Sequence, residues 1–205
     1  ENQTNGRGQQ GSLWQSSSKL NLLVSLILSS TQLSKVNPIS INWYISVCII
    51  EFLKSKKINA KIKWPNDVLV DSLKISGILI ENKFLGSNLK SSIAGVGINV
   101  NQLDFQRMPA TSMKMQTGQD YSIDELLDHL IGYLNENEQL IYSEQNKKLK
   151  DKYLKDLFGL EDERIFSTHS KSFSGKIIGV DDAGRLLVES NGSVLSFQNK
   201  EVKFL

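Results

Sequence analysis

The feature that most restricts the fold of this chain is a stiff corner at residues 63–67, with the sequence Lys-Trp-Pro-Asn-Asp. Short apolar segments with a strand pattern lie on both sides of it, at 60–62 and 68–70. Pro65 has no backbone N–H to donate to a sheet and fixes its own φ, so strand pairing must stop here. A stiff loop rich in polar groups is where a scaffold commonly holds chemistry. The alternative is a plain proline turn whose amide and carboxylate bond their own backbone.

The composition is that of an ordinary globular chain. Its 205 residues are 40% apolar and 22% charged, with a net charge of +2. This predicts one or two domains and gives no indication of nucleic acid or a membrane as partner. The single cysteine, Cys48, cannot form an internal disulfide, so we expect a cytoplasmic protein without a metal cluster of its own. Because the chain starts at Glu1 without methionine, we expect its first domain to be N-terminally incomplete.

A glycine-rich loop occupies residues 6–11, Gly-Arg-Gly-Gln-Gln-Gly. The loop matches the dinucleotide pattern G-x-G-x-x-G, but that function needs a strand before the loop and a helix after it. Here a predicted strand at 21–28 follows the loop, and the first acidic residue after it is Glu51. The glycine amides and Arg7 instead suit a phosphate or carboxylate. A flexible loop without a ligand is the alternative.

Three glycines lie inside the strands predicted after the corner. These strands cover 74–81 and 93–101, and we expect them to pair, with a loop at 84–90 between them. Glycine weakens a strand unless the backbone bulges or a ligand approaches it closely. The position of these glycines favours a bound molecule that lies across the sheet. They are Gly77, Gly95 and Gly97.

The remaining segments predict an α+β chain. A nearly all-apolar stretch at 41–56, preceded by Ser40 as N-cap, predicts a helix that is covered on most faces. Ser122 opens another helix with a capping box. Short alternating segments separated by tight turns near the C-terminus predict a small antiparallel barrel. We therefore expect a first domain over 1–160 and a barrel domain over 161–205.

Taken together, these motifs resemble a known family. The chain is similar to the biotin protein ligases of the short bacterial type, and the likeness runs in the same order along nearly the whole chain. It implies a mixed β-sheet catalytic domain with flanking helices, as in biotin and lipoate ligases, followed by a small SH3-like β-barrel. The residues that carry it include Gly6, Arg7, Gly8 and Trp14, the corner at 63–67, Lys74 with Gly77, and Gly95 to Asn99.

The resemblance implies a two-step, ATP-dependent reaction with Mg²⁺. The biotin carboxylate attacks the α-phosphate of ATP to form biotinyl-5'-adenylate, and a lysine of a biotin carboxyl carrier protein domain then displaces AMP. The implied partners are biotin, ATP and that carrier domain, without nucleic acid or membrane, and a homodimer is left open.

The resemblance also assigns the site residues. Lys74, Arg7 and Asp67 are the implied catalytic residues. Biotin and the adenylate are assigned to Gln3, Gly6, Arg7, Gly8, Gln9, Trp14, Lys74, Gly77, Gly95 and Gly97. The nucleotide with its magnesium is assigned to Lys63, Asn66, Asp67 and Asn99, and no metal is expected to be held by the protein alone. Cations at these positions offset the repulsion between the two anions, and a carboxylate such as Asp67 suits deprotonation of the incoming lysine.

The chain departs from the family pattern at several positions. Gln9 and Ser12 replace further basic residues, so weaker retention of the adenylate is expected. Lys19 and Leu20 replace a glycine and a small residue before Asn21. The family's early Ser/Thr-Asn segment would lie upstream of the first residue. Two other functions remain open: a lipoate or octanoate transferase of the same architecture, and a non-catalytic module that binds biotin or a carrier.

Overall fold

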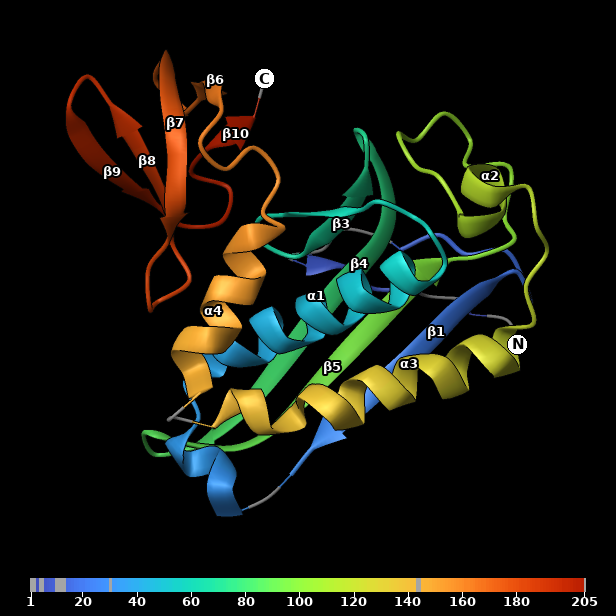
Figure 1. Ribbon diagram of the computed structural model, residues 1–205. Helices are drawn as coiled ribbons and strands as arrows, with labels where there is room; N and C mark the ends of the chain where they lie inside the picture. Colours follow the sequence, from blue (N-terminus) through green and yellow to red (C-terminus); the bar gives the residue numbers. More distant parts are fainter. Residues whose placement is uncertain (1–2, 4–5, 10–13, 30, 143–144, 205) are drawn as a thin grey trace.

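The first part of the chain forms a five-stranded sheet with the strand order β1-β5-β4-β3-β2 (Figure 1). The structure is a computed structural model, and it describes residues 3, 6–9, 14–29, 31–142 and 145–204. The strands are β1 (Asn21–Leu28), β2 (Lys61–Lys63), β3 (Asp67–Val70), β4 (Leu73–Leu85) and β5 (Asn88–Asn99).

Every strand pair in this sheet is antiparallel, which corrects the expected mixed sheet. For β2 to β5 the reason is that tight connections join successive strands, and short connections can only produce antiparallel neighbours. Strand β1 pairs antiparallel with β5 although the two are distant in sequence. The loop expected at 84–90 is also wrong. Strands β4 and β5 continue to a turn at Gly86, whose φ of 61° suits glycine.

Two helices cover one face of the sheet: α1 (Pro38–Ser55) and α3 (Ile123–Asn137) (Figure 1). Helix α1 starts earlier than expected, because Asn37 is its N-cap and Pro38 its first residue, a position that proline favours. Ser40 lies inside the helix and donates to Asn146. In α3, Ser122 is the N-cap and accepts from the Glu125 amide, as predicted. The shorter helices are η2 (Thr31–Lys35), α2 (Met113–Thr117), η3 (Glu138–Ile141) and α4 (Asn146–Lys155).

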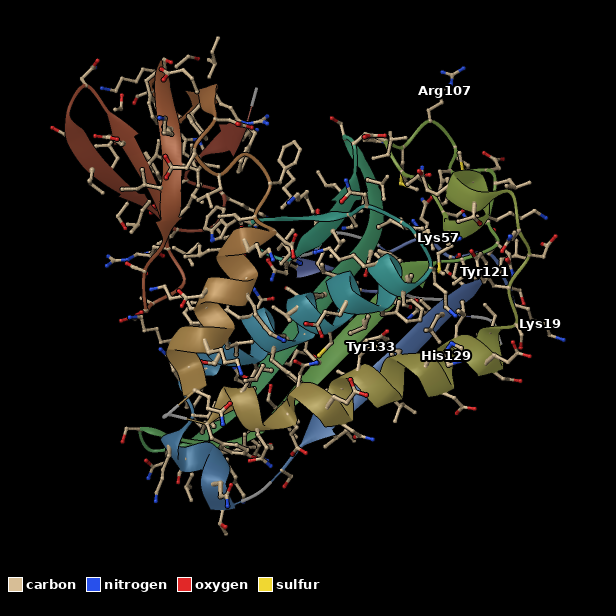
Figure 2. All side chains as sticks on the ribbon, viewed as in Figure 1. Lys19, Lys57, Arg107, Tyr121, His129 and Tyr133 are labelled. Carbon is tan, nitrogen blue, oxygen red and sulfur yellow. The ribbon has the colours of Figure 1, made fainter. Side chains whose placement is uncertain are left out.

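Helix α1 is the centre of the hydrophobic core, as its apolar sequence predicted. Trp43 packs against Tyr153 of α4 with ring centroids 6.0 Å apart. Cys48 is fully buried and contacts the Tyr133 carbonyl of α3. Figure 2 shows Tyr133 and His129 on α3. The Nζ atom of Lys56, just after α1, lies 2.9 Å from Nδ1 of His129. Burial raises the pKa of the Cys48 thiol, with the Glu51 charge as a smaller cause.

The C-terminal part forms a second antiparallel sheet with the order β10-β6-β7-β8-β9. Phe166 packs between Phe173 and Phe204, with centroid separations of 5.6 Å to each. The strands that are described leave β9 and β10 as the two edges of the sheet, and closure into an SH3-like barrel stays a prediction. The strands are β6 (Glu163–Ser167), β7 (Ser172–Val180), β8 (Leu186–Ser190), β9 (Ser193–Phe197) and β10 (Lys203–Phe204).

One turn of the second sheet joins it to the first part of the chain. The Trp64 indole donates to the Gly184 carbonyl at 2.8 Å, and Asn37 donates to the Asp182 carbonyl at 2.8 Å. Gly184 has a φ of 80°, and a Cβ there would lie 2.5 Å from Ile39. The corner and the start of α1 thus fix the second sheet in place. Within the described ranges, no helix is long and apolar enough to cross a membrane.

Candidate active site

A groove of about 1170 Å³ runs between the glycine loop, the corner, strands β1, β4 and β5, and the end of the C-terminal sheet. It brings together residues that are distant in sequence. Nearly every residue that the sequence assigned to the site lines it: Gln3, Arg7, Gly8, Gln9, Trp14, Lys63, Asn66, Asp67, Lys74, Gly77, Gly95 and Gly97. The two exceptions are Gly6 and Asn99.

The corner is rigidly held. Asn42 of α1 donates to the Pro65 carbonyl at 2.8 Å. Asn66 pairs with β4 twice, because its side-chain nitrogen donates to the Ile78 carbonyl at 2.6 Å and its own carbonyl accepts from the Ile78 amide at 3.0 Å. The corner therefore holds the next residue, Asp67, at the start of β3 with its carboxylate in the groove.

Lys74 and Asp67 form an ion pair of 2.6 Å between Nζ and Oδ1. Both side chains are partly exposed, at 34% for Lys74 and 29% for Asp67. The ammonium also lies 5.5 Å from the centre of the Trp14 ring, a favourable cation–π contact. The two predicted catalytic residues on the sheet are thus in direct contact.

The backbone of Lys74 is fixed on its outer side by the segment after β5. The Lys74 amide donates to the Pro109 carbonyl at 3.0 Å, and its carbonyl accepts from the Thr111 amide at 2.9 Å. Asn99, 3% exposed, adds a further bond to the Lys74 carbonyl at 3.2 Å and one to the Thr111 carbonyl at 3.0 Å. Asn99 therefore lies beneath Lys74, outside the groove lining. Arg107 projects from this segment, away from the sheet (Figure 2).

Trp14 fills the space above two of the in-strand glycines. A Cβ on Gly97 would lie 2.5 Å from Trp14 Cζ2, and a Cβ on Gly77 would lie 3.1 Å from Trp14 Cζ3. Gly95 differs, since its Cβ would make only ordinary contact with Leu79 at 3.6 Å. The Trp14 Nε1 atom is buried and has no hydrogen-bond partner among the described residues. The indole, and not only a ligand, explains why β4 and β5 need glycine here.

The glycine loop meets both the indole and the C-terminal sheet. The Trp14 amide donates to the Gly6 carbonyl at 3.1 Å, and a side chain on Gly6 would collide with the Trp14 carbonyl. Gly6 lines a smaller neighbouring cavity of about 440 Å³. The Gln9 side chain accepts from Asn199 at 2.8 Å. Ser12, which stands where the family pattern has a basic residue, lies outside the described residues.

Sequence reasoning missed the contribution of the C-terminal sheet. Asn199, Lys200, Val202, Lys203 and Phe204 all line the groove. Lys63 lies 5.5 Å from the centre of the Phe204 ring, so this sheet also positions a predicted nucleotide-binding cation. No motif marks these residues, and contacts between distant parts of the chain, among them the turn at Gly184 and the Asn199–Gln9 hydrogen bond, bring them to the groove.

The described residues contain no cluster of three or more His, Cys, Asp or Glu side chains able to hold a metal. Arg7 and Lys63 make no ion pair within the described part of the chain, and both line the groove. The groove thus offers cations to an anionic ligand, and of its described carboxylates Asp67 is already paired with Lys74.

Comparison with known proteins agrees with this geometry. Residues 1–99 match the Biotin/lipoate A/B protein ligase family. The bifunctional ligase/repressor BirA of Bacillus subtilis is 27% identical over 99% of this chain. The biotin protein ligase from Aquifex aeolicus, solved in complex with biotin and ATP, superimposes with a TM-score of 0.75 at 26% identity, covering 99% of this chain and 85% of that one. In sequence and in fold, this chain is similar to biotin protein ligases.

The chain matches only part of the length of these relatives. The chain spans 64% of the length of the Bacillus subtilis relative. Biotin–protein ligase 1 of Arabidopsis thaliana is 36% identical, over 48% of this chain and 28% of the relative. The comparisons confirm the expected α+β fold, here with antiparallel sheets and flanking helices, and the closed SH3-like barrel stays a prediction.

Proposed function

We propose that this protein ligates biotin to a lysine of a carrier domain through biotinyl-5'-adenylate, with ATP as the second substrate. The observation that carries the proposal is the meeting of Lys74, Asp67 and Arg7 in one groove that residues of the C-terminal sheet also line. The similarity to relatives such as the biotin–[acetyl-CoA-carboxylase] ligase of Paracoccus denitrificans supports the same substrates.

In the first step, the biotin carboxylate attacks the α-phosphorus of ATP and pyrophosphate leaves. Both reactants are anions, so their approach is opposed by repulsion. Lys74, Arg7 and Lys63 line the groove and offset it, and charges fixed in a site poor in water act more strongly than in bulk water. Trp14 covers the sheet beneath Lys74 and excludes water from that side.

Magnesium fits this site as an ion that arrives with the nucleotide. Mg²⁺ is usually held by substrate phosphates, water and one or two carboxylates, and the groove supplies Asp67 for that purpose. When bound, the ion would neutralise charge on the phosphates. Asn66 holds the corner in place, since its side-chain nitrogen donates a hydrogen bond to the Ile78 carbonyl of β4.

In the second step, the acceptor lysine attacks the acyl carbon and AMP leaves. A lysine with a pKa near 10.4 is protonated at neutral pH and must lose a proton first. Asp67 is the carboxylate in the groove nearest to Lys74 and is placed to receive it. The C-terminal residues at the groove mouth would then lie beside the carrier domain.

The proposal is tested by pyrophosphate exchange. The purified protein is incubated with ATP, magnesium and labelled pyrophosphate, and label entering ATP is measured with biotin, with lipoate and with neither. Biotin-dependent exchange is the expected result. Exchange that depends on lipoate would assign the chain to the lipoate or octanoate transferases, and the absence of exchange with either acid would indicate a binding module.

Three further statements belong to the same proposal. We place the domain boundary at residues 160 and 161, just after α4, and we assign the protein to the cytoplasm. The described residues that line the groove all come from one chain, and a homodimer remains open. Sedimentation with and without biotin and ATP would establish whether a homodimer forms.

A further inference from the structure

The turn between β7 and β8, residues 181–185, contacts the first part of the chain but lies outside the groove. None of its residues, all of which the structure describes, belongs to the groove lining. The Gly184 carbonyl accepts from the Trp64 indole at 2.8 Å, and the Asp182 carbonyl accepts from Asn37 at 2.8 Å. One short turn of the C-terminal sheet is therefore bonded both to the corner and to the start of α1.

The shape of this turn is set within the turn itself. The Asp181 carboxylate accepts from the backbone amides of Ala183 and Arg185 at 3.0 Å and 2.8 Å, and it forms an ion pair of 2.6 Å with the Arg185 side chain. The Gly184 amide donates to the Asp181 carbonyl at 3.0 Å. The φ of Gly184 is 80°, a left-handed conformation that favours glycine. The carbonyl that meets Trp64 is therefore held by bonds in which Trp64 takes no part.

Trp64 lies between two residues that line the groove from the corner. Lys63 precedes it, Asp67 follows three residues later, and the two are register partners in the β2–β3 pair. Trp64 is 6% exposed, and the Gly184 carbonyl satisfies its indole nitrogen. Because a buried donor that loses its partner costs free energy, the indole and the strand end that carries it should follow the position of the turn.

The corner has three anchors, and each comes from a different element. Asn42 of α1 holds the Pro65 carbonyl, and Ile78 of β4 pairs with Asn66. Both of these anchors act after Trp64 in the chain. The turn of the C-terminal sheet is the anchor at Trp64 itself, so it holds the side of the corner that leads back into β2 and its groove cation.

Lys74, on the other side of the groove, is held independently of this turn. Its backbone bonds to Pro109, Thr111 and Asn99, none of which belongs to the C-terminal sheet. A shift of the turn should therefore disturb the corner and leave the backbone of Lys74 in place. In the proposed reaction this separates the two substrates, since the corner is assigned to ATP and Lys74 to the biotin carboxylate.

We propose that Gly184 is a positioning residue of the active site, whose carbonyl acts through the Trp64 indole to hold the corner in the geometry that binds ATP. The inference rests on the proposed function and gives the C-terminal sheet a role beyond the residues that line the groove. A displacement of about 1 Å that originates far from the chemistry can cost on the order of 100-fold in rate. Loss of one hydrogen bond has a smaller effect, about two- to tenfold in an equilibrium constant.

The first test removes the indole donor and keeps an aromatic ring. Trp64→Phe leaves the Gly184 carbonyl without its partner. The KM for ATP in biotin-dependent pyrophosphate exchange should rise about two- to tenfold. The dissociation constant of biotin, measured by titration calorimetry without ATP, should stay at the wild-type value, because Lys74 keeps its own anchors. A purely structural defect would weaken the binding of both substrates together.

The second test moves the turn and keeps Trp64. In Gly184→Ala the new Cβ would lie 2.5 Å and 2.7 Å from two atoms of Ile39, at a left-handed φ of 80°. Gly192→Ala is the matched control, because Gly192 has a similar φ of 73° in another turn of the same sheet but no atom within 4 Å of its Cβ. Only Gly184→Ala should raise the KM for ATP. Adding Ile39→Ala to Gly184→Ala removes the two colliding atoms and should restore part of the ATP affinity.

A wild-type KM for ATP in Trp64→Phe would overturn the inference, and so would an equal rise in Gly184→Ala and Gly192→Ala. A parallel loss of biotin affinity in Trp64→Phe would assign the bond to general stability and overturn it as well. If circular dichroism shows that one of the Trp64 and Gly184 variants does not fold, the other decides, and failure of both to fold would again assign the bond to stability. Wild-type protein without biotin-dependent exchange would instead refute the proposed function itself.

Discussion

Replacement of Gly97 by alanine tests whether the Trp14 indole occupies the space above the sheet. The added Cβ would lie 2.5 Å and 2.6 Å from two atoms of the indole, closer than real Cβ contacts, so the ring or the strand must move. If the strand yields, overpacking costs about 1–3 kcal/mol, and the melting temperature falls by about 2–4 °C for each kcal/mol. If the ring moves out, Lys74 loses a cation–π contact worth about 0.5–1 kcal/mol.

Differential scanning fluorimetry and tryptophan emission distinguish these two results. Trp43 and Trp64 are buried, at 2% and 6% exposed, so a red shift in emission would report Trp14. Gly95→Ala is the matched control, because its Cβ meets only Leu79 at 3.6 Å. The control should leave both the melting temperature and the emission of the ligand-free protein unchanged. A Gly97→Ala protein with wild-type stability and emission would refute this placement of the indole.

Two more predictions concern the site, and one concerns the buried core. Lys74→Ala should reduce biotin-dependent pyrophosphate exchange at least tenfold, the effect of losing a charge-assisted hydrogen bond, and should change the free energy of unfolding by less than about 0.5 kcal/mol. Lys74→Arg should restore the exchange only in part. Wild-type exchange in the alanine variant would remove Lys74 from the mechanism. Gln9→Arg should slow the release of labelled biotinyl-adenylate, because it adds a charged donor for phosphate. Asn199→Ala only breaks the contact with Gln9 and should not slow the release. Release from Gln9→Arg at the wild-type rate would place that side chain away from the phosphate. Cys48 should resist iodoacetamide at pH 8 in the folded protein and react after denaturation, because burial raises its pKa and disfavours the thiolate; modification of the native protein would contradict this.

Local sequence chemistry was sufficient to predict most elements. Proline at the corner, the capping box at Ser122 and the apolar stretch of α1 each depend on neighbours within a few residues, and each prediction agrees with the structure. The errors also have local causes. Polar residues at 86–88 looked like a long loop, but one glycine with positive φ is enough to close a hairpin, and the strands continue on both sides.

The role of Asn99 could not be predicted in the same way. From the sequence, an amide at a strand end suggested a contact with the nucleotide. In the structure the amide is buried and holds the backbone of Lys74, because the segment at 109–111 returns to pair with the start of β4. That return places the carbonyls of Lys74 and Thr111 beside the amide, and no local pattern in the sequence indicates it.

The net charge of the groove lining differs from the net charge of the whole chain. The chain carries a net charge of +2, which by itself indicates no anionic partner. The groove is lined by six basic and three acidic residues, a surplus of three that is larger than the net charge of the entire chain. Two of the six, Lys200 and Lys203, come from the C-terminal sheet, and without them the surplus would fall to one. A concave surface of one sign concentrates ligands of the opposite charge. Because Gln9 adds no charge to the glycine loop, the C-terminal sheet supplies two of the three surplus positive charges, and this surplus suits the anionic substrates of the proposed reaction.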